Sequence, residues 1–206
     1  AEDVSVEFPA DSRNITATLT YSDHDPFDIR VTCSVSLEQG STLSKWRIAV
    51  QNHTDYGIRA IRFPIIIAPS FHGSYREQDY LLIGEGSGRL IRGPFERHVP
   101  RLAPGGLGFR ATGGQRETWA PQWQYPGQMA VQLQAYYTET VGLYVATYDG
   151  EGQVKHFGPM ITEDGLDLSV EHNFDECPGV DFELPYDTIV GAFHGDWYEA
   201  ADLYKA

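Results

Sequence analysis

Aromatic and glutamine side chains suited to sugar binding gather between residues 119 and 128, in the sequence WAPQWQYPGQ. Rings held in a loop by prolines form flat platforms for sugar rings, whose C–H faces are apolar, while glutamines can bond the hydroxyl groups. The candidate carbohydrate contacts are Trp119, Trp123, Tyr125 and Gln128. The same rings could instead pack beneath the loop or against a neighbouring domain, and the sequence favours neither interpretation.

A second place where chemistry is conceivable is the acidic stretch 163–187, which holds nine carboxylates in 25 residues. Two of them could form a pair of the glycosidase type, which requires carboxyl groups roughly 5–10 Å apart. Several oxygens together could also hold calcium, although the spacing of an EF-hand loop is absent. A solvated acidic face is the favoured interpretation, and we expect neither a metal nor a cofactor.

The remaining motifs do not assemble into an active site. The seven histidines are dispersed, without the spacing of a zinc site, and no serine lies in a G-x-S-x-G motif. The glycines of segment 84–88 precede a strand-like segment, 89–92, rather than a helix, so they indicate a turn and not a phosphate loop. We assign no catalytic residue. A sugar epimerase that uses His156 or His172 with a glutamate is the least favoured alternative.

Composition limits the partners of this 206-residue chain. Its formal net charge of −14 disfavours nucleic acid and anionic membrane surfaces. No apolar run approaches the roughly 20 residues of a membrane span. The compartment stays open, with a secreted or periplasmic location slightly favoured.

Cys33 lies on the apolar phase of a strand pattern, which predicts a buried free thiol, and a disulfide with Cys177 is the alternative.

Apolar and polar residues alternate along most of the chain, which is typical of antiparallel strands with one buried face. Strands are expected at 4–8, 15–21, 29–37, 46–50, 58–63, 80–83, 129–138, 142–148, 154–161, 166–172 and 188–193. The turn residues at 149–152 indicate a hairpin between two of them. Segment 84–128, rich in Gly, Pro and Arg, is expected to be a long loop excursion. This pattern predicts an all-β fold, a large antiparallel two-sheet sandwich.

The last twelve residues have the pattern of a helix. Asp196 is a suitable N-cap, and an apolar face follows at positions i, i+3, i+4 and i+7. The residues of that face are Trp197, Ala200, Ala201 and Tyr204. No stop signal follows them, so we expect residues 1–194 to form the sandwich and 195–206 to begin a helix that links to a further domain. The apolar face is the candidate domain interface, on this sandwich or on that further domain.

Several segments, taken in order, resemble a known group of proteins. They are 45–52 (KWRIAVQN) with 61–64 (IRFP), 125–132 (YPGQMAVQ), 142–149 (GLYVATYD) with 155–157 (KHF), and 195–204 (GDWYEAADLY). They resemble the N-terminal region of uncharacterised bacterial proteins related to glycoside hydrolases. In that group a galactose-mutarotase-like supersandwich precedes a (β/α)8 barrel, and the Gly-Asp-Trp helix leads into the barrel.

The resemblance implies a function for the chain. The catalytic carboxylates of such proteins lie on the barrel, so the chain would be a non-catalytic accessory domain, whose loop 84–128 is the natural candidate to reach the rim of the active site. The partners implied are that barrel and a carbohydrate. A carbohydrate-binding module that uses the loop aromatics is the alternative.

Overall fold

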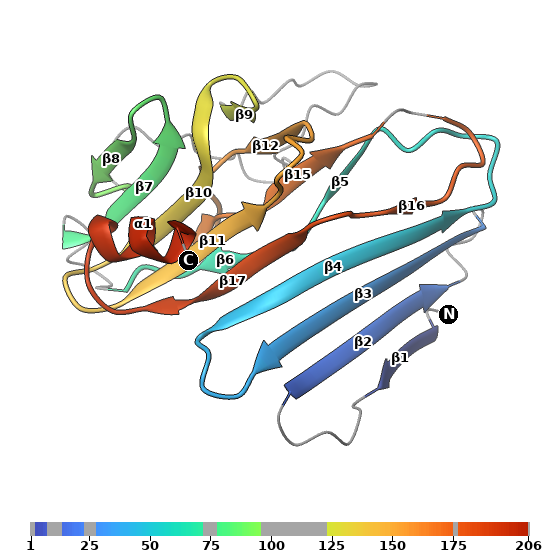
Figure 1. The fold of residues 1–206 in the computed structure, drawn as a ribbon, viewed down its shortest axis with the longest axis horizontal. Helices are drawn as coiled ribbons and strands as arrows, with labels where there is room; N and C mark the ends of the chain where they lie inside the picture. Colours follow the sequence, from blue (N-terminus) through green and yellow to red (C-terminus); the bar gives the residue numbers. More distant parts are fainter. Residues whose placement is uncertain are drawn as a thin grey trace.

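The computed structural model describes residues 3–7, 14–22, 28–71, 78–95, 123–174 and 177–205. Antiparallel strands dominate it, as the alternating pattern predicts (Figure 1). The largest sheet contains, from edge to edge, β1 (Asp3–Glu7), β2 (Asn14–Ser22), β3 (Ile29–Glu38), β4 (Leu43–Asn52), β17 (Asp187–Phe193), β11 (Gly142–Tyr148), β10 (Met129–Tyr137), β7 (Tyr80–Glu85) and β8 (Arg89–Arg92). The short β16 (Phe182–Glu183) pairs with the far half of β4.

Two smaller sheets form the second layer. One has the order β5 (Ala60–Arg62), β15 (Val170–Asn173), β12 (Lys155–Phe157) and β9 (Trp123–Tyr125). The other has the order β13 (Met160–Ile161), β14 (Leu166–Asp167) and β6 (Ile67–Ala68). Their inward side chains share a core with the large sheet, where Phe157 and Leu166 pack with Tyr136 and Val145. The expected all-β supersandwich is therefore confirmed.

The central strands of the large sheet are buried on both faces, unlike the expected pattern of one buried and one wet face. In β10, every residue from Gln132 to Tyr137 is buried. One face contacts the smaller sheets, and the other packs beneath the only helix of the described residues, α1 (Trp197–Lys205). Figure 1 shows this helix over β10. Because α1 comes from the end of the chain, the local alternation could not reveal that second cover.

For two segments, the prediction of one continuous strand is wrong, because each segment forms two strands. Segment 154–161 is divided into β12 and β13, and segment 166–172 into β14 and β15, with the parts in different sheets. Pro159 lacks the N–H that a continuing ladder needs. In the second segment, Asp167 Oδ1 accepts from the Ser169 N–H at 2.9 Å, which turns the backbone locally.

The predicted hairpin at 149–152 is also wrong. β11 and β12, which flank it, belong to different sheets, so the segment is a crossover between layers. The Asp149 carboxylate accepts from the N–H groups of Glu151, Gly152 and Gln153, at 2.9, 3.2 and 2.6 Å. A turn-forming sequence fixes the direction of the chain, but it does not select the strand that will be paired.

The glycines of segment 84–88 form a turn, as expected. The turn joins β7 to β8, and Gly88 N donates to Glu85 O at 2.8 Å. Gly86 N donates to Gln128 O at 2.9 Å, which ties this turn to the start of β10. Within the predicted excursion 84–128, the structure thus contains β8 and β9, while residues 96–122 lie outside the described part.

Both cysteines are free thiols. Cys33 is half-buried on β3, and burial raises the pKa of its thiol to about 11, while Cys177 is exposed. Within the described residues, no helix is long and apolar enough to span a membrane.

Candidate functional site

The loop aromatics do not form an open platform in the described structure. Trp123 lies on β9 with 7% of its surface exposed, in the core between the sheets. Tyr125 points to the same side and is half-buried, with Lys155 Nζ 5.1 Å from its ring centroid. Alternation along β9 turns both rings inward, because residues two apart share a face of a sheet. Trp119 lies outside the described residues.

Gln128, the fourth candidate contact, is exposed but engaged within its own hairpin. Its Oε1 accepts from Gln124 N at 3.3 Å across the β9–β10 turn. The side chain thus lies at the surface but supports the turn, while the two described rings of the predicted platform face away from solvent.

Helix α1 begins as the sequence predicts. The Asp196 carboxylate accepts from Tyr198 N at 2.8 Å, and Glu199 Oε2 accepts from Asp196 N at 3.0 Å. This reciprocal arrangement is a capping box, and it satisfies N–H groups at the helix start that have no partner within the helix.

One part of the predicted apolar face of α1 packs on the large sheet, and the other part is more exposed. Ala200 has no exposed surface and Tyr204 is half-buried, and both pack on the outer face of the large sheet. The Tyr204 hydroxyl also accepts from Gln132 N at 3.3 Å. Ala201 is half-buried, whereas Trp197 is 47% exposed.

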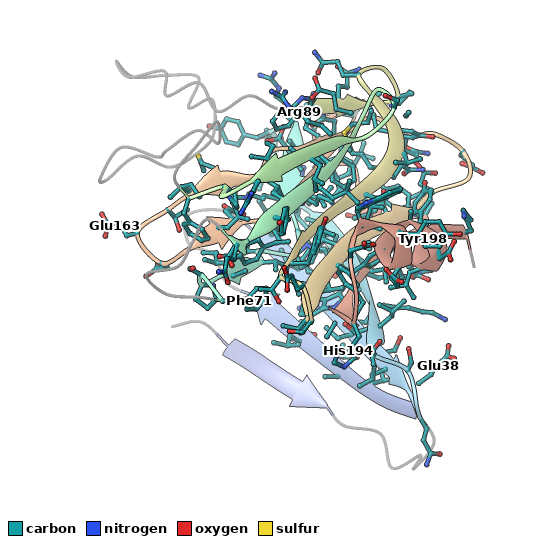
Figure 2. The ribbon with its side chains drawn as sticks, turned by 90° about the vertical axis from the view of Figure 1, so that its left-hand side faces the viewer. Glu38, Phe71, Arg89, Glu163, His194 and Tyr198 are labelled. Carbon is teal, nitrogen blue, oxygen red and sulfur yellow. The ribbon has the colours of Figure 1, made fainter. Side chains whose placement is uncertain are left out.

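An apolar surface lies beside the outer side of α1. Trp197 contacts Tyr198, which is 53% exposed, with ring centroids 5.9 Å apart. Figure 2 shows Tyr198 projecting from this part of the molecule. A groove of about 420 Å³ lies between the helix and the end of β17, and Phe193 and Leu203 provide its apolar lining. We call Trp197 and Tyr198 the helix surface.

A buried polar cluster in the sandwich was not found by sequence reasoning. The Lys155 ammonium has no exposed surface, and its Nζ lies 2.6 Å from Asp149 Oδ2. It also donates to Gln132 Oε1 at 3.0 Å and to Gln153 O at 2.8 Å. Burial lowers the pKa of Lys155, and Asp149 opposes that change. The sequence does not reveal that a lysine in an alternating strand points inward. The one indication here is that Lys155 is two residues from Phe157 and therefore shares its face of the strand.

The two histidines of the epimerase alternative have different surroundings. His172 is buried, and its ring nitrogens are bonded to the Tyr186 hydroxyl and to Phe63 O, each at 2.7 Å. Burial lowers its pKa to about 4. A substrate cannot reach this ring without displacing a core contact. His156 lies on the other face of the small sheet, with Nδ1 3.6 Å from Glu171 Oε1.

The acidic stretch 163–187 is a solvated face only in part: Glu163, Asp164 and Glu183 are exposed, while other acids are bonded within the sandwich. Asp167 is buried against Arg62, Asp181 accepts from Asn52 N at 2.9 Å, and Asp187 pairs with Arg47 at 2.5 Å. These acids therefore serve separate contacts within the sandwich. Across the described part of the chain, no group of three or more His, Cys, Asp or Glu side chains is arranged to hold a metal ion.

The sequence matches no protein-family profile and no curated protein. Its fold does match solved structures. The α-N-acetylgalactosaminidase NagBb from Bifidobacterium bifidum, in a GalNAc complex, matches with a TM-score of 0.62 at 9% identity, over 98% of this chain and 30% of that chain. The GH36 α-galactosidase AgaA from Geobacillus stearothermophilus matches with a TM-score of 0.50 at 11% identity, over 95% of this chain and 28% of that one.

A galactose mutarotase related enzyme from Lactobacillus acidophilus matches with a TM-score of 0.45 at 14% identity, over 93% of this chain and 71% of that chain. The chain thus spans about a third of the length of the glycoside hydrolases that it matches. The fold is the all-β supersandwich that the sequence led us to expect, and the two glycoside hydrolases contain a similar fold as one part of a longer chain.

Proposed function

We propose that this chain is a non-catalytic accessory domain of a longer glycoside hydrolase, in which it packs on a (β/α)8 barrel and helps to shape the active site. The observation that carries the proposal is the extent of the fold match. Nearly all of this chain, 98%, corresponds to only 30% of NagBb. The comparison supports a domain that accompanies another unit, because the matched fold is one part of a larger enzyme.

The helix surface is the proposed contact with the barrel. One side of α1 is fixed on the sandwich by Ala200 and Tyr204, so the helix has a defined direction. Elsewhere on the helix, Trp197 and Tyr198 are about half exposed. Neighbouring exposed aromatic side chains are typical of interaction surfaces. The proposed rim loop is the excursion 84–128, which starts and ends on neighbouring elements of the sandwich, β7 and β10.

The first test is an activity assay on the isolated chain. Aryl α-galactosides and aryl N-acetyl-α-galactosaminides are suitable substrates, since enzymes with this fold include an α-galactosidase and an α-N-acetylgalactosaminidase. We expect no turnover by the pure chain. Turnover that co-purifies with the chain, and that survives repeated purification, would refute the non-catalytic role.

The second test addresses the helix surface in the full-length protein. The double variant Trp197→Ser with Tyr198→Ser should lower the free energy of unfolding of the isolated chain by no more than about 2 kcal/mol, because about half of each ring is exposed. In the full-length protein it should lower the melting temperature and the activity. Val180→Ser is the matched control, since Val180 is 54% exposed in a different segment. Equal behaviour of the two variants in the full-length protein would contradict the contact.

A further inference from the structure

A row of polar side chains crosses the outer face of the four-stranded sheet. The strand register places Arg62 opposite Glu171, Glu171 opposite His156, and His156 opposite Gln124. Their neighbours along the strands point into the core, so alternation turns all four side chains outward. At about 4.8 Å between strands, the row is about 14 Å long. We call these four residues the outer polar row.

The row is neither a fully solvated surface nor a closed core. The side chains of Arg62, Glu171 and His156 are 18%, 16% and 20% exposed, and Gln124 is exposed. Partial burial restricts their rotamers and leaves part of each side chain accessible, and a site is better organised when its side chains are held in place. The groups are also fixed by neighbours: Arg62 pairs with Asp167, and Asn173 Nδ2 lies 3.0 Å from His156 Nδ1.

The charges of the row favour a neutral ligand over an ion. The Arg62 guanidinium is flanked by the carboxylates of Asp167 and Glu171, which offset its charge. The pKa of His156 is lowered by burial and further by the nearby Arg59, while Glu171 raises it, and the net shift is downward. The ring is therefore neutral at pH 7. The net charge of the whole chain, −14, also repels anions.

Hydrogen-bond donors and acceptors alternate along the row. His156 Nδ1 lies 3.0 Å from Asn173 Nδ2 and 3.6 Å from Glu171 Oε1, so Nε2 is the ring nitrogen that faces away from both, and it donates or accepts according to the tautomer. Glu171 presents acceptors on one side of it. On the other side Gln124 presents its amide, whose Nε2 already donates to Pro126 O at 3.3 Å and has a second N–H. A hydroxyl group is itself both donor and acceptor, so neighbouring hydroxyls on one molecule match such an alternation.

We infer that the outer polar row binds a neutral, polyhydroxylated ligand, a sugar, through hydroxyl contacts to Glu171, His156 and Gln124. This site differs from the loop aromatics, of which Trp123 faces the core. The inference goes beyond the proposed accessory role, because a sugar can bind this face whether or not the helix surface contacts a barrel.

The experiment is a titration of the isotope-labelled chain, followed by the backbone N–H resonances in NMR spectra. Galactose and N-acetylgalactosamine are the neutral probes, and inorganic phosphate is the anionic probe. We expect saturable shifts for the sugars, centred on the residues of β12 and β15. The inference is overturned by the absence of saturable shifts, by shifts centred outside the small sheet, or by tighter binding of phosphate.

Variants separate a binding role from a structural one. Glu171→Gln removes the charged acceptor with little change of shape, and the dissociation constant should rise at least about tenfold, as expected for a lost charge-assisted hydrogen bond. Glu38→Gln, which removes an exposed carboxylate paired with Lys45, is the control and should bind as wild type does. Equal affinity in both variants refutes the site. If Glu171→Gln does not fold, the wild-type shift map alone decides, and neither result bears on the helix-surface test.

Discussion

Lys155 is a charged side chain with no exposed surface, and it forms an ion pair with the Asp149 carboxylate. Burial alone would raise the pKa of Asp149, but the hydrogen bonds from Lys155 and from the N–H groups of Glu151 and Gln153 hold it below its usual value. Because Asp149 directly follows β11 and Lys155 begins β12, this one ion pair joins the large sheet to the second layer. The cluster therefore fixes the crossover that replaces the expected hairpin.

Asp149→Asn should destabilise the chain strongly, because it leaves the Lys155 charge buried without a countercharge. Breaking a buried pair in this way costs about 3–5 kcal/mol. The free energy of unfolding, measured by urea denaturation at pH 7, is the readout. Asp202→Asn serves as the control, since Asp202 pairs with Lys205 at the surface and its loss should matter little. Similar losses for both variants would show that the buried pair has no special role.

His172 should make stability depend on pH. Its pKa lies near 4 in the folded chain because of burial, against 6.5 for the unperturbed side chain. Between these two pH values the unfolded state binds more protons than the folded state. The contribution of His172 to the free energy of unfolding is therefore fully present above about pH 6.5 and is lost as the pH falls. Below about pH 4 this group causes no further change. The predicted loss over that window is about 3 kcal/mol.

Urea denaturation at pH 7 and pH 4, for wild type and for His172→Asn, isolates this contribution from that of the carboxylates. The variant should lose less stability between the two pH values than wild type does. An equal loss in both proteins would mean that His172 does not titrate in this window.

At the scale of elements, close packing of strands depends on residues without side chains. Gly142 begins β11 opposite Phe193 of β17. A Cβ atom at Gly142 would collide with the Phe193 ring and with Tyr137 Cβ. Tyr137 and Phe193 also belong to the core beneath α1. The close approach at Gly142 is therefore part of the packing between the helix and the large sheet.

Gly142→Ala should destabilise the chain by about 1–3 kcal/mol, because the buried ring must move to admit the methyl group. Gly150→Ala is the matched control, since a Cβ there would meet no atom within 4 Å. Thermal and urea unfolding of both variants give the comparison. A loss at Gly150 equal to that at Gly142 would point to backbone entropy or an unfolded-state effect, and not to the collision.

At the scale of the whole molecule, the dominant quantity is the net charge of −14. Like charges on a compact chain repel one another, and this repulsion opposes folding. The exposed ion pairs, such as Lys45 with Glu38, contribute little in compensation.

Salt should therefore stabilise the chain. At an ionic strength of about 0.15 M the Debye length is about 8 Å, which screens charges spread over the surface. We expect the melting temperature to rise by a similar amount in sodium chloride and potassium chloride, as measured by calorimetry. A rise produced only by one cation, for example calcium, would instead indicate a specific ion site.

The sequence by itself determined the strand-rich fold, the helix at residues 197–205 with its Asp196 cap, and the turn at 84–88, because each depends on neighbours in the chain. Alternation, capping and glycine placement are local, and the residues that express them are adjacent in the sequence.

Only the tertiary structure decided which strands share a sheet and which side chains meet. It divided segments 154–161 and 166–172 between two sheets, turned Trp123 into the core, and placed His156 beside Glu171. These outcomes depend on the register between strands that are distant in sequence. A period of two assigns each residue to one of two faces, but it does not say what covers that face.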